Sequence, residues 1–366
     1  MKKIALAAAL LTLAAASYAY NPPLGGENLH SLISPELISG GASATGGPIF
    51  TVVPASITYN PAITALEQRV TLDLSGTMLF NTENNLPGDS SVGGGFQLGL
   101  LVPTRYGVFT GTVQGLFCDM YSLNIGNSVV LHGGASKDIT EKLSVGMNVY
   151  TGFYFGCGGG SDFTVGADLG VLYLPNDIGF LKEPKFGISL LNCGKPASSY
   201  KVLGIDKKEG NSYPGILTPR VSFGAVLFKT PSISGGFSAD LSFPTCQNVV
   251  ADFGFGVTMA KIITVATSWQ ANVRELLEQS SDAVSWPSVG VNCRLSFKSE
   301  KVGNKFADWK QSEITPSLAW QNLYSGIHAV SAGAKINLGM EDKDAPVIYL
   351  WDEEMTEDES TANNGE

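Results

Sequence analysis

The sequence predicts an all-β fold, a transmembrane antiparallel β-barrel of about fourteen strands with an N-terminal plug in its lumen. Charged residues make up 15% of the chain, which also has 43 glycines and 10% aromatic residues; soluble proteins carry about 25% charge. No later stretch reaches the ~18 uninterrupted apolar residues that a spanning helix needs. From residue 69 the sequence alternates between apolar and small or polar residues. A soluble β-sandwich is the alternative, but it normally exposes more charge.

The N-terminus has the pattern of a secretory signal peptide. Two lysines within residues 1–3 precede an apolar run over residues 4–16 and a small-x-small site that ends at Ala19. We therefore expect residues 1–19 to be cleaved. A transmembrane anchor is the alternative, but the apolar run is shorter than the ~20 residues that a spanning helix requires.

Period-2 segments fill the predicted barrel region, residues 67–340. The clearest is 142–156, where Leu143, Val145 and Met147 share one face and Ser144 and Gly146 the other. We count fourteen such segments, and this even number fits bacterial single-chain barrels. The predicted strands are 69–80, 93–104, 108–118, 127–137, 142–156, 163–174, 185–195, 219–230, 234–244, 249–259, 262–273, 288–299, 313–325 and 327–340.

The connections alternate between long and short, as expected for a barrel in the outer membrane of a diderm bacterium. The two longest on the predicted outer side, 196–218 and 274–287, contain apolar residues. They either capture lipid or fold together as a cap. One connection breaks the rule, because 300–312 is long on the predicted inner side.

Residues 20–66 precede all strands, and glycines on the predicted lumen faces leave space inside the barrel. We expect this segment to form a plug; a flexible periplasmic arm is the alternative. At the other end, residues 341–366 hold ten acidic residues and one lysine. Such a tail is expected to be disordered in the periplasm. The acidic balance argues against nucleic acid as a partner.

Ionisable residues on the predicted lumen faces suggest one binding role. Arg220 or Arg294 has the geometry to bind a ligand carboxylate. The favoured alternative is a structural pair of an arginine with Asp240 or Asp252. The predicted lumen-facing set is Asp73, Asp168, Arg220, Asp240, Asp252, Arg294 and Lys335.

Four cysteines, Cys118, Cys157, Cys193 and Cys246, fall near the predicted outer strand ends. Two disulfides or four unpaired thiols are equally compatible with this placement. Cys293 is expected to face lipid as a free thiol. The cysteine spacing does not fit a metal site, and no nucleophile–base pair or phosphate-binding loop stands out. The sequence therefore predicts neither an enzyme nor a bound cofactor or metal.

The segment Gly40-Gly41-Ala42-Ser43-Ala44 leads to Tyr59-Asn60-Pro61-Ala62-Ile63 and then to the first strand. This resembles the start of the FadL-type long-chain fatty-acid transport family, most of all its spirochaete branch. The resemblance implies a monomeric barrel in outer-membrane lipid, closed by an N-terminal hatch. Fatty acids or similar molecules would be captured at the outer loops and enter an apolar pocket. They would leave either laterally through the barrel wall or past a displaced hatch.

The resemblance assigns the hatch motif to Asn60, Pro61 and Ala62, with Gly40 and Gly41 as further gate residues. Proline fixes φ, and the residue before it is extended, so a rigid corner is expected; an ordinary turn is the alternative. The expected pocket residues are Ile49, Phe50, Val52 and Val53. Unlike the family barrels, this chain continues past Met340, unless residues 347–351 add a strand. A surface interaction protein with a closed hatch, or a general porin, are the other functions considered.

Overall fold

The computed structural model describes residues 29–49, 52–82, 92–118, 126–156, 159–207, 212–277, 284–297, 312–322 and 326–341. The predicted signal peptide, Phe50, Cys157 and residues 342–366 lie outside this part of the chain. No helix among the described residues is long and apolar enough to cross a membrane.

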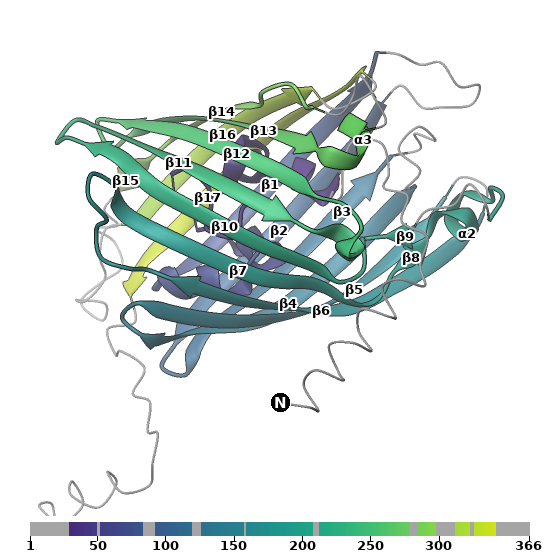
Figure 1. Ribbon diagram of the computed structural model, residues 1–366, viewed down its shortest axis with the longest axis horizontal. Coiled ribbons are helices and arrows are strands. Elements are labelled where there is room, and N and C mark those ends of the chain that lie inside the picture. Colours follow the sequence, from purple (N-terminus) through teal and green to yellow (C-terminus); the bar gives the residue numbers. More distant parts are fainter. Residues whose placement is uncertain are drawn as a thin grey trace, which may run out of the picture.

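The strands form one closed antiparallel barrel (Figure 1). Neighbours in sequence pair around the ring; β7 pairs with β10, and β1 with β17 closes it. The strands of the wall are β1 (Arg69–Asn81), β2 (Val92–Thr104), β3 (Gly107–Phe117), β4 (Asn127–Thr140), β5 (Leu143–Phe155), β6 (Ser161–Tyr173), β7 (Lys182–Lys195), β10 (Thr218–Lys229), β11 (Ile233–Ser242), β12 (Val250–Met259), β13 (Ile263–Asn272), β14 (Val289–Cys293), β15 (Leu295–Phe297), β16 (Ser312–Asn322) and β17 (Ile327–Glu341).

The wall has fourteen strands, because β14 and β15 are two parts of one strand that both pair with β16. The prediction of fourteen strands is thus confirmed, with strand ends within a few residues of those expected. The break has a local cause. In the register of β16, Pro316 lies opposite Cys293, between the two parts, and proline supplies no N–H to the ladder.

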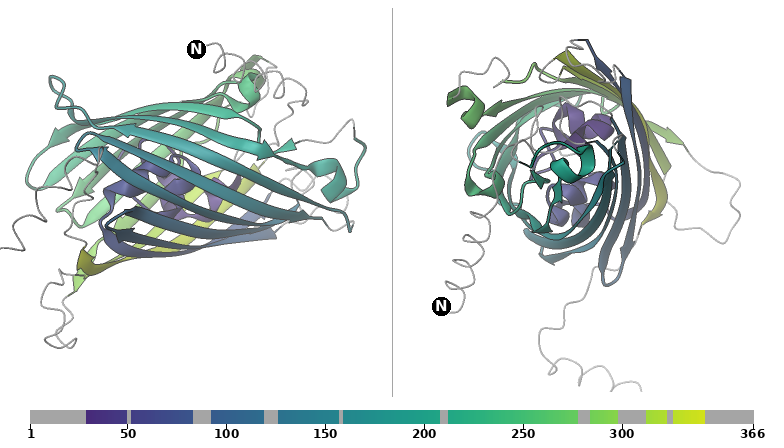
Figure 2. Two further views of the ribbon diagram at one scale, coloured as in Figure 1. Left: turned by 90° about the horizontal axis from the view of Figure 1, so that it is seen from below. Right: turned by 90° about the vertical axis from the view of Figure 1, so that its right-hand side faces the viewer.

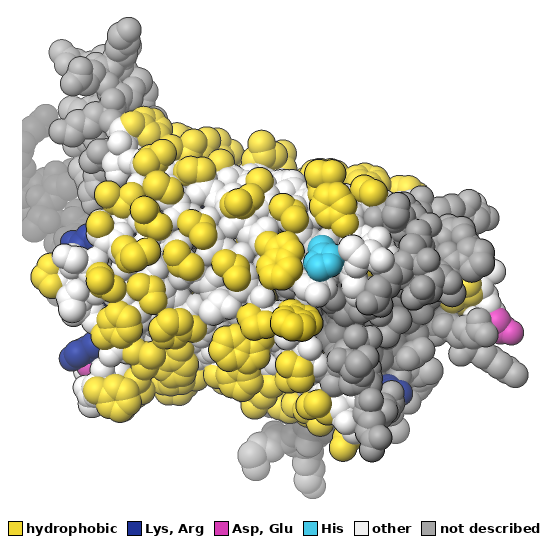
Figure 3. All heavy atoms as spheres, turned by 90° about the horizontal axis from the view of Figure 1, so that it is seen from above, with side chains coloured by type: hydrophobic (Ala, Val, Ile, Leu, Met, Phe, Trp, Pro, Cys, Tyr) yellow, Lys and Arg dark blue, Asp and Glu magenta, His cyan; other side chains and the backbone are white. Residues whose placement is uncertain are grey.

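The burial pattern of the wall is the reverse of that of a soluble protein. On β1, Leu74 is 60% exposed while its neighbour Asp73 is 1% exposed. Figure 3 shows apolar side chains spread over the described wall, with Lys, Arg, Asp and Glu only toward the ends. An apolar outer band over a polar interior is the signature of a barrel that spans a lipid bilayer. The protein is therefore an integral outer-membrane barrel.

The N-terminal segment lies inside the barrel as four short helical turns (Figure 2). They are η1 (Leu29–Ile33), η2 (Leu37–Gly41), η3 (Pro54–Thr58) and η4 (Pro61–Leu66). Most of their residues are buried, and they contact strands on both sides of the ring. We use "the plug" for residues 29–49 and 52–66, which occupy the lumen instead of extending away from it.

Glycines on the inner wall let the plug approach the strand backbones. A Cβ at Gly170 would lie 2.0 Å from the side-chain oxygen of Asn60, and one at Gly146 would lie 2.4 Å from the carbonyl carbon of Pro61. A Cβ at Gly187 would lie 2.0 Å from the carbonyl oxygen of Ala44. The space predicted from the lumen-face glycines is therefore filled by the plug itself.

The connection at 196–218 folds into the mouth of the barrel and forms β8 (Ala197–Ser198), α2 (Ser199–Leu203) and β9 (Ser212–Tyr213). Val202, Leu203 and Tyr213 share one buried apolar cluster with Leu29 and Leu32 of the plug. The described part of this connection is therefore a cap on the plug, although the packing is against the plug and not against 274–287 as the cap alternative supposed. The rim that bears it also holds η6 (Pro244–Cys246) and α3 (Val273–Leu277).

The junction between β13 and β14 is less regular than that between β12 and β13. β13 pairs with β14 over four residue pairs, Ile263–Ala266 with Gly290–Cys293, whereas β12 and β13 pair over ten. Toward the cap, the contact continues as scattered bonds to residues 284–288, including Thr267 Oγ1 to the Ser288 carbonyl at 2.6 Å. We call this irregular contact, residues 267–272 against 284–288, the seam.

We expect Gly170→Ala to loosen the plug without unfolding the barrel, because its Cβ would collide with Asn60. The matched control is Gly133→Ala, since a Cβ at Gly133 has no atom within 4 Å among those described. Both variants should keep the heat-sensitive gel shift of a folded barrel, and only Gly170→Ala should admit protease to residues 29–66. Equal protease resistance would contradict the proposed packing.

Candidate functional site

Asn60 forms the corner predicted from sequence. Its backbone is extended (φ −156°, ψ 103°), and its side-chain oxygen accepts from the Ala62 N–H at 3.0 Å at the start of η4. Its amide nitrogen donates to the Ala44 carbonyl at 2.7 Å and to the Val171 carbonyl of β6 at 3.0 Å. This fully buried residue therefore fastens two parts of the plug to each other and to the wall.

Gly40 and Gly41 end η2 in a sharp turn. Gly40 has a φ of 106°, and a Cβ at Gly41 would lie 2.6 Å from the Glu36 carbonyl oxygen. The turn holds η2 against β12, β13, β14 and β16. There the Ser268 hydroxyl of β13 donates to the Ile38 carbonyl at 2.9 Å. The plug is thus bonded directly to the seam.

Arg220 pairs with both of the aspartates expected from sequence. Its Nε donates to Asp240, and its Nη2 lies 3.3 Å from an Asp252 oxygen. The same Nη2 donates to the Ala42 carbonyl of the plug at 2.8 Å. The other oxygen of Asp240 accepts from the Ala44 N–H at 2.7 Å. The favoured structural pairing is confirmed, and it joins the wall to the plug.

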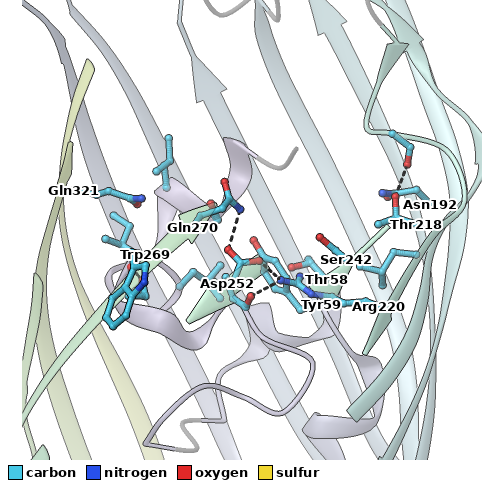
Figure 4. Close-up of a pocket in the computed structure, with 18 residues that line it drawn as sticks. Thr58, Tyr59, Asn192, Thr218, Arg220, Ser242, Asp252, Trp269, Gln270 and Gln321 are labelled. Atoms are coloured by element: carbon cyan, nitrogen blue, oxygen red, sulfur yellow. Dashed lines mark hydrogen bonds and ion pairs between the residues drawn. The ribbon is translucent and has the colours of Figure 1, made fainter. Parts of the chain in front are cut away.

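A cavity of ≈ 110 Å³ lies between the plug and the wall beside this network (Figure 4). We call it the main cavity because it adjoins the network that joins wall and plug, although the cavity lined by Ile49, Lys185 and Lys229 is larger, at ≈ 330 Å³. The main cavity runs from Arg220 and Asp252 to Trp269 and Gln321 near the seam. Its lining is both polar and apolar: Ser31, Leu32, Leu37, Ile38, Ala42, Thr58, Tyr59, Leu191, Asn192, Gly215, Thr218, Arg220, Ser242, Asp252, Ser268, Trp269, Gln270 and Gln321.

Tyr59 and Gln270 complete the polar end of the main cavity. The Arg220 guanidinium lies over the Tyr59 ring, 5.1 Å from its centroid. Gln270 donates to the second oxygen of Asp252 at 2.9 Å. Burial raises the pKa of the Tyr59 hydroxyl, which stays protonated. Gln270 faces the lumen, whereas Trp269, the preceding residue of β13, is 38% exposed and stacks on Phe253.

A smaller chamber of ≈ 40 Å³ adjoins the main cavity and shares Thr58 and Asn192 with it. Its polar groups are bonded across strands. Asn148 donates to Asp168 at 2.7 Å, and the backbone N–H of Asn192 donates to the other Asp168 oxygen at 2.7 Å. His30 of the plug contacts the Tyr213 hydroxyl and the Ser128 hydroxyl, each at 3.2 Å. This chamber links plug, wall and cap.

The residues expected to form a greasy pocket are dispersed. Ile49 lines a separate cavity with Lys185 and Lys229, Val52 packs near Ala62 and Ile63, and Val53 is buried with Leu37 and Tyr59. None of these three lines the main cavity, and Phe50 is outside the described residues. Their role in binding stays a prediction.

Arg294 does not join Arg220. It is exposed at the interruption between β14 and β15, and its backbone N–H donates to the Ile262 carbonyl at 2.7 Å. The alternation expected through 288–299 is lost there, since Leu295, Ser296 and Phe297 are all exposed. Because the strand is interrupted opposite Pro316, Arg294 is exposed at the break and does not line the candidate site.

For the four cysteines near the capped rim, the sequence is equally compatible with two bridges and with four unpaired thiols. Cys193 and Cys246 carry free thiols in the structure, which argues against two disulfides among the four. Cys118 is buried in the cluster shared by plug and cap. Cys293 is a free thiol, as predicted.

His30 makes the packing of the plug inside the barrel sensitive to acid. Burial lowers the pKa of His30 to about 4 from its ordinary 6.5. A released plug binds that proton more readily, so the plug is fully stabilised above pH 6.5 and loses stability as the pH falls toward 4, by roughly 3 kcal/mol in total.

We expect hydrogen exchange of plug amides to accelerate between pH 7 and pH 4.5, after correction for intrinsic rates. His30→Gln should remove most of this acceleration, whereas His328→Gln should keep it. An unchanged pH dependence in His30→Gln would exclude His30 as the cause.

No family model matches the chain, and no curated protein matches it. Among solved structures it is similar to the Pseudomonas putida toluene transporter TodX, with 10% identity, 87% of this chain and 100% of that chain covered, and a TM-score of 0.50. It is also similar to a Pseudomonas aeruginosa FadL homologue (11% identity, 84% and 97% covered, TM-score 0.47). A third similar structure is the CymD monoaromatic hydrocarbon channel (12% identity, 87% and 98% covered, TM-score 0.44).

At this identity the similarity concerns the fold. TodX is covered along its whole length, and the strand count and closure agree with the barrel expected from the FadL resemblance. The chain therefore has the fold of a FadL-type outer-membrane barrel.

Proposed function

We propose that this protein is an outer-membrane channel for the uptake of hydrophobic small molecules, with the plug as its gate. Long-chain fatty acids are the class that the sequence resemblance implies. The observation that carries the proposal is the main cavity beside the plug, which ends next to Trp269 at the seam. A purely structural barrel needs no such cavity.

A route into the main cavity is supported by apolar side chains on the capped rim. Leu277 is 80% exposed and Trp286 is 68% exposed. Val284 bridges to Ala271 of β13, two residues from Trp269. Exposed apolar groups of this kind mark surfaces that bind apolar partners. We propose that they capture the ligand and deliver it to Trp269.

The proposed exit is the seam. The plug carbonyl of Ile38 accepts a hydrogen bond from the Ser268 hydroxyl, which also contacts the Ser288 hydroxyl across the seam, so movement of η2 would alter a residue that holds the seam. A ligand in the main cavity would then pass between β13 and the residues before β14. Apolar burial in the bilayer favours this step without an energy source.

A second candidate is a surface interaction protein whose plug never moves. The bonds of Asn60, Arg220 and Ser268 between wall and plug favour it, because each adds to the cost of displacement. This candidate predicts no uptake at all, whereas the channel predicts uptake that depends on those bonds.

The first test is uptake of a labelled fatty acid and a labelled aromatic hydrocarbon by a host that lacks its own hydrophobic channel. We expect the protein to increase uptake of at least one compound. Asn60→Ala should reduce this uptake and admit polar dyes, because it removes three hydrogen bonds worth roughly 3 kcal/mol together. Uptake equal to that of the empty host would favour the interaction protein.

The exit is tested by a disulfide across the seam. The Ser268 and Ser288 hydroxyl oxygens are 2.8 Å apart, so Ser268→Cys with Ser288→Cys can form a bridge when the native cysteines are replaced by serine. Oxidation should block uptake, and reduction should restore it.

The control bridge joins β12 to β13 where the ladder is regular. The Thr258 and Thr264 hydroxyl oxygens are 3.1 Å apart, and Thr258→Cys with Thr264→Cys should leave uptake unchanged. Full uptake through the oxidised seam would eliminate the lateral exit and leave the displaced plug as the route.

A further inference from the structure

We propose that the main cavity selects hydrophobic molecules with a neutral or cationic head group that donates a hydrogen bond, and that it discriminates against carboxylates. This inference rests on the proposed uptake function and names the class of ligand. It differs from the expectation that Arg220 binds a fatty-acid carboxylate.

The positive charge of Arg220 is already compensated within the protein. Two aspartates contact the guanidinium, and a third contact goes to the Ala42 carbonyl. The cluster of Arg220, Asp240 and Asp252 has a net charge of −1 when both acids are ionised and of zero when one is protonated. In neither state does it attract an anion.

Asp252, the most exposed member of this cluster, is a hydrogen-bond acceptor. The Asp252 side chain is 23% exposed, compared with 7% for Arg220 and 1% for Asp240. Only Asp252 and Arg220 of the cluster line the cavity. A carboxylate has about four lone-pair sites, and two contacts, from Arg220 and Gln270, are made to Asp252. A donor head group can therefore bond to Asp252, whereas a carboxylate would be repelled.

The surrounding lumen strengthens this preference. Among described residues with buried side chains, the acids are Glu36, Asp73, Asp168, Asp240 and Glu275, and the one arginine or lysine is Arg220. Like charges in a medium of low dielectric constant repel strongly. The charged residues that line the main cavity itself are Arg220 and Asp252, and the other buried acids act on an anion there from a distance.

The other end of the main cavity suits an apolar tail. Leu32, Leu37 and Ile38 of the plug line it there, and Trp269 of β13, which is 38% exposed and stacks on Phe253, lies at its edge. In Figure 4 the Trp269 ring and the Asp252 carboxylate lie in different parts of the cavity lining. A molecule with its tail near Trp269 and its head at Asp252 would use both ends.

The test compares three probes with the same ten-carbon chain, decanol, decylamine and decanoate, on the detergent-folded mature barrel at pH 7. Native mass spectrometry gives the fraction of barrel that is bound at each probe concentration. We expect decanol and decylamine to bind about tenfold or more tightly than decanoate, since juxtaposed like charges cost several kcal/mol. Decanoate binding equally or more tightly would overturn the inference while supporting uptake of fatty acids.

Asp252→Asn identifies the group responsible. It removes one negative charge at the same size, so the preference for decylamine over decanoate should shrink by several-fold. Asp177→Asn, an exposed acid paired with Lys182 in the β6–β7 turn, should leave the preference unchanged. A preference that Asp252→Asn does not alter would overturn the assignment to this cluster. Absence of binding by all three probes would overturn the proposed uptake function itself.

Discussion

The contact between the Asn60 corner and the bare backbone of β5 and β6 is the constraint on which the interior depends. Gly146 and Gly170 have no side chains to hold the plug away, and the Asn60 amide then reaches the Val171 carbonyl. The position of η4 follows from this contact, and with it the points where Ala42 and Ala44 meet Arg220 and Asp240. The space left between the plug and the opposite wall is the main cavity.

The same arrangement explains why the lumen is polar although a hydrophobic ligand is proposed. A strand that faces lipid on one side must put its polar residues on the other, and the plug backbone needs partners there because water is scarce. Asp240 and Ser268 each bond to the plug backbone, and Arg220 does so through Ala42. Much of the polarity inside the barrel thus serves to bind the plug, and the part that remains accessible at Asp252 is free to act on a ligand.

The strands could be predicted because apolar and polar residues alternate along each of them. On β1, Leu72, Leu74 and Met78 face lipid, while Asp73 and Thr77 face inward. The Asn60 corner was predictable for a similar local reason, as was the pairing of Arg220 with nearby aspartates on neighbouring strands. Features that depend on closure of the ring were not predictable. The seam arises from irregular pairing near residues 284–288, the cap from the inward fold of 196–218, and the exposure of Arg294 from a proline on another strand.

The buried cluster that joins Leu29 and Leu32 to Val202, Leu203 and Tyr213 has a consequence for the permeability of the envelope. Among the described residues, the plug and the cap meet in this one apolar cluster, which disfavours a continuous column of water at this level of the barrel. In a planar bilayer such a barrel would carry little ionic current, in contrast to an open porin.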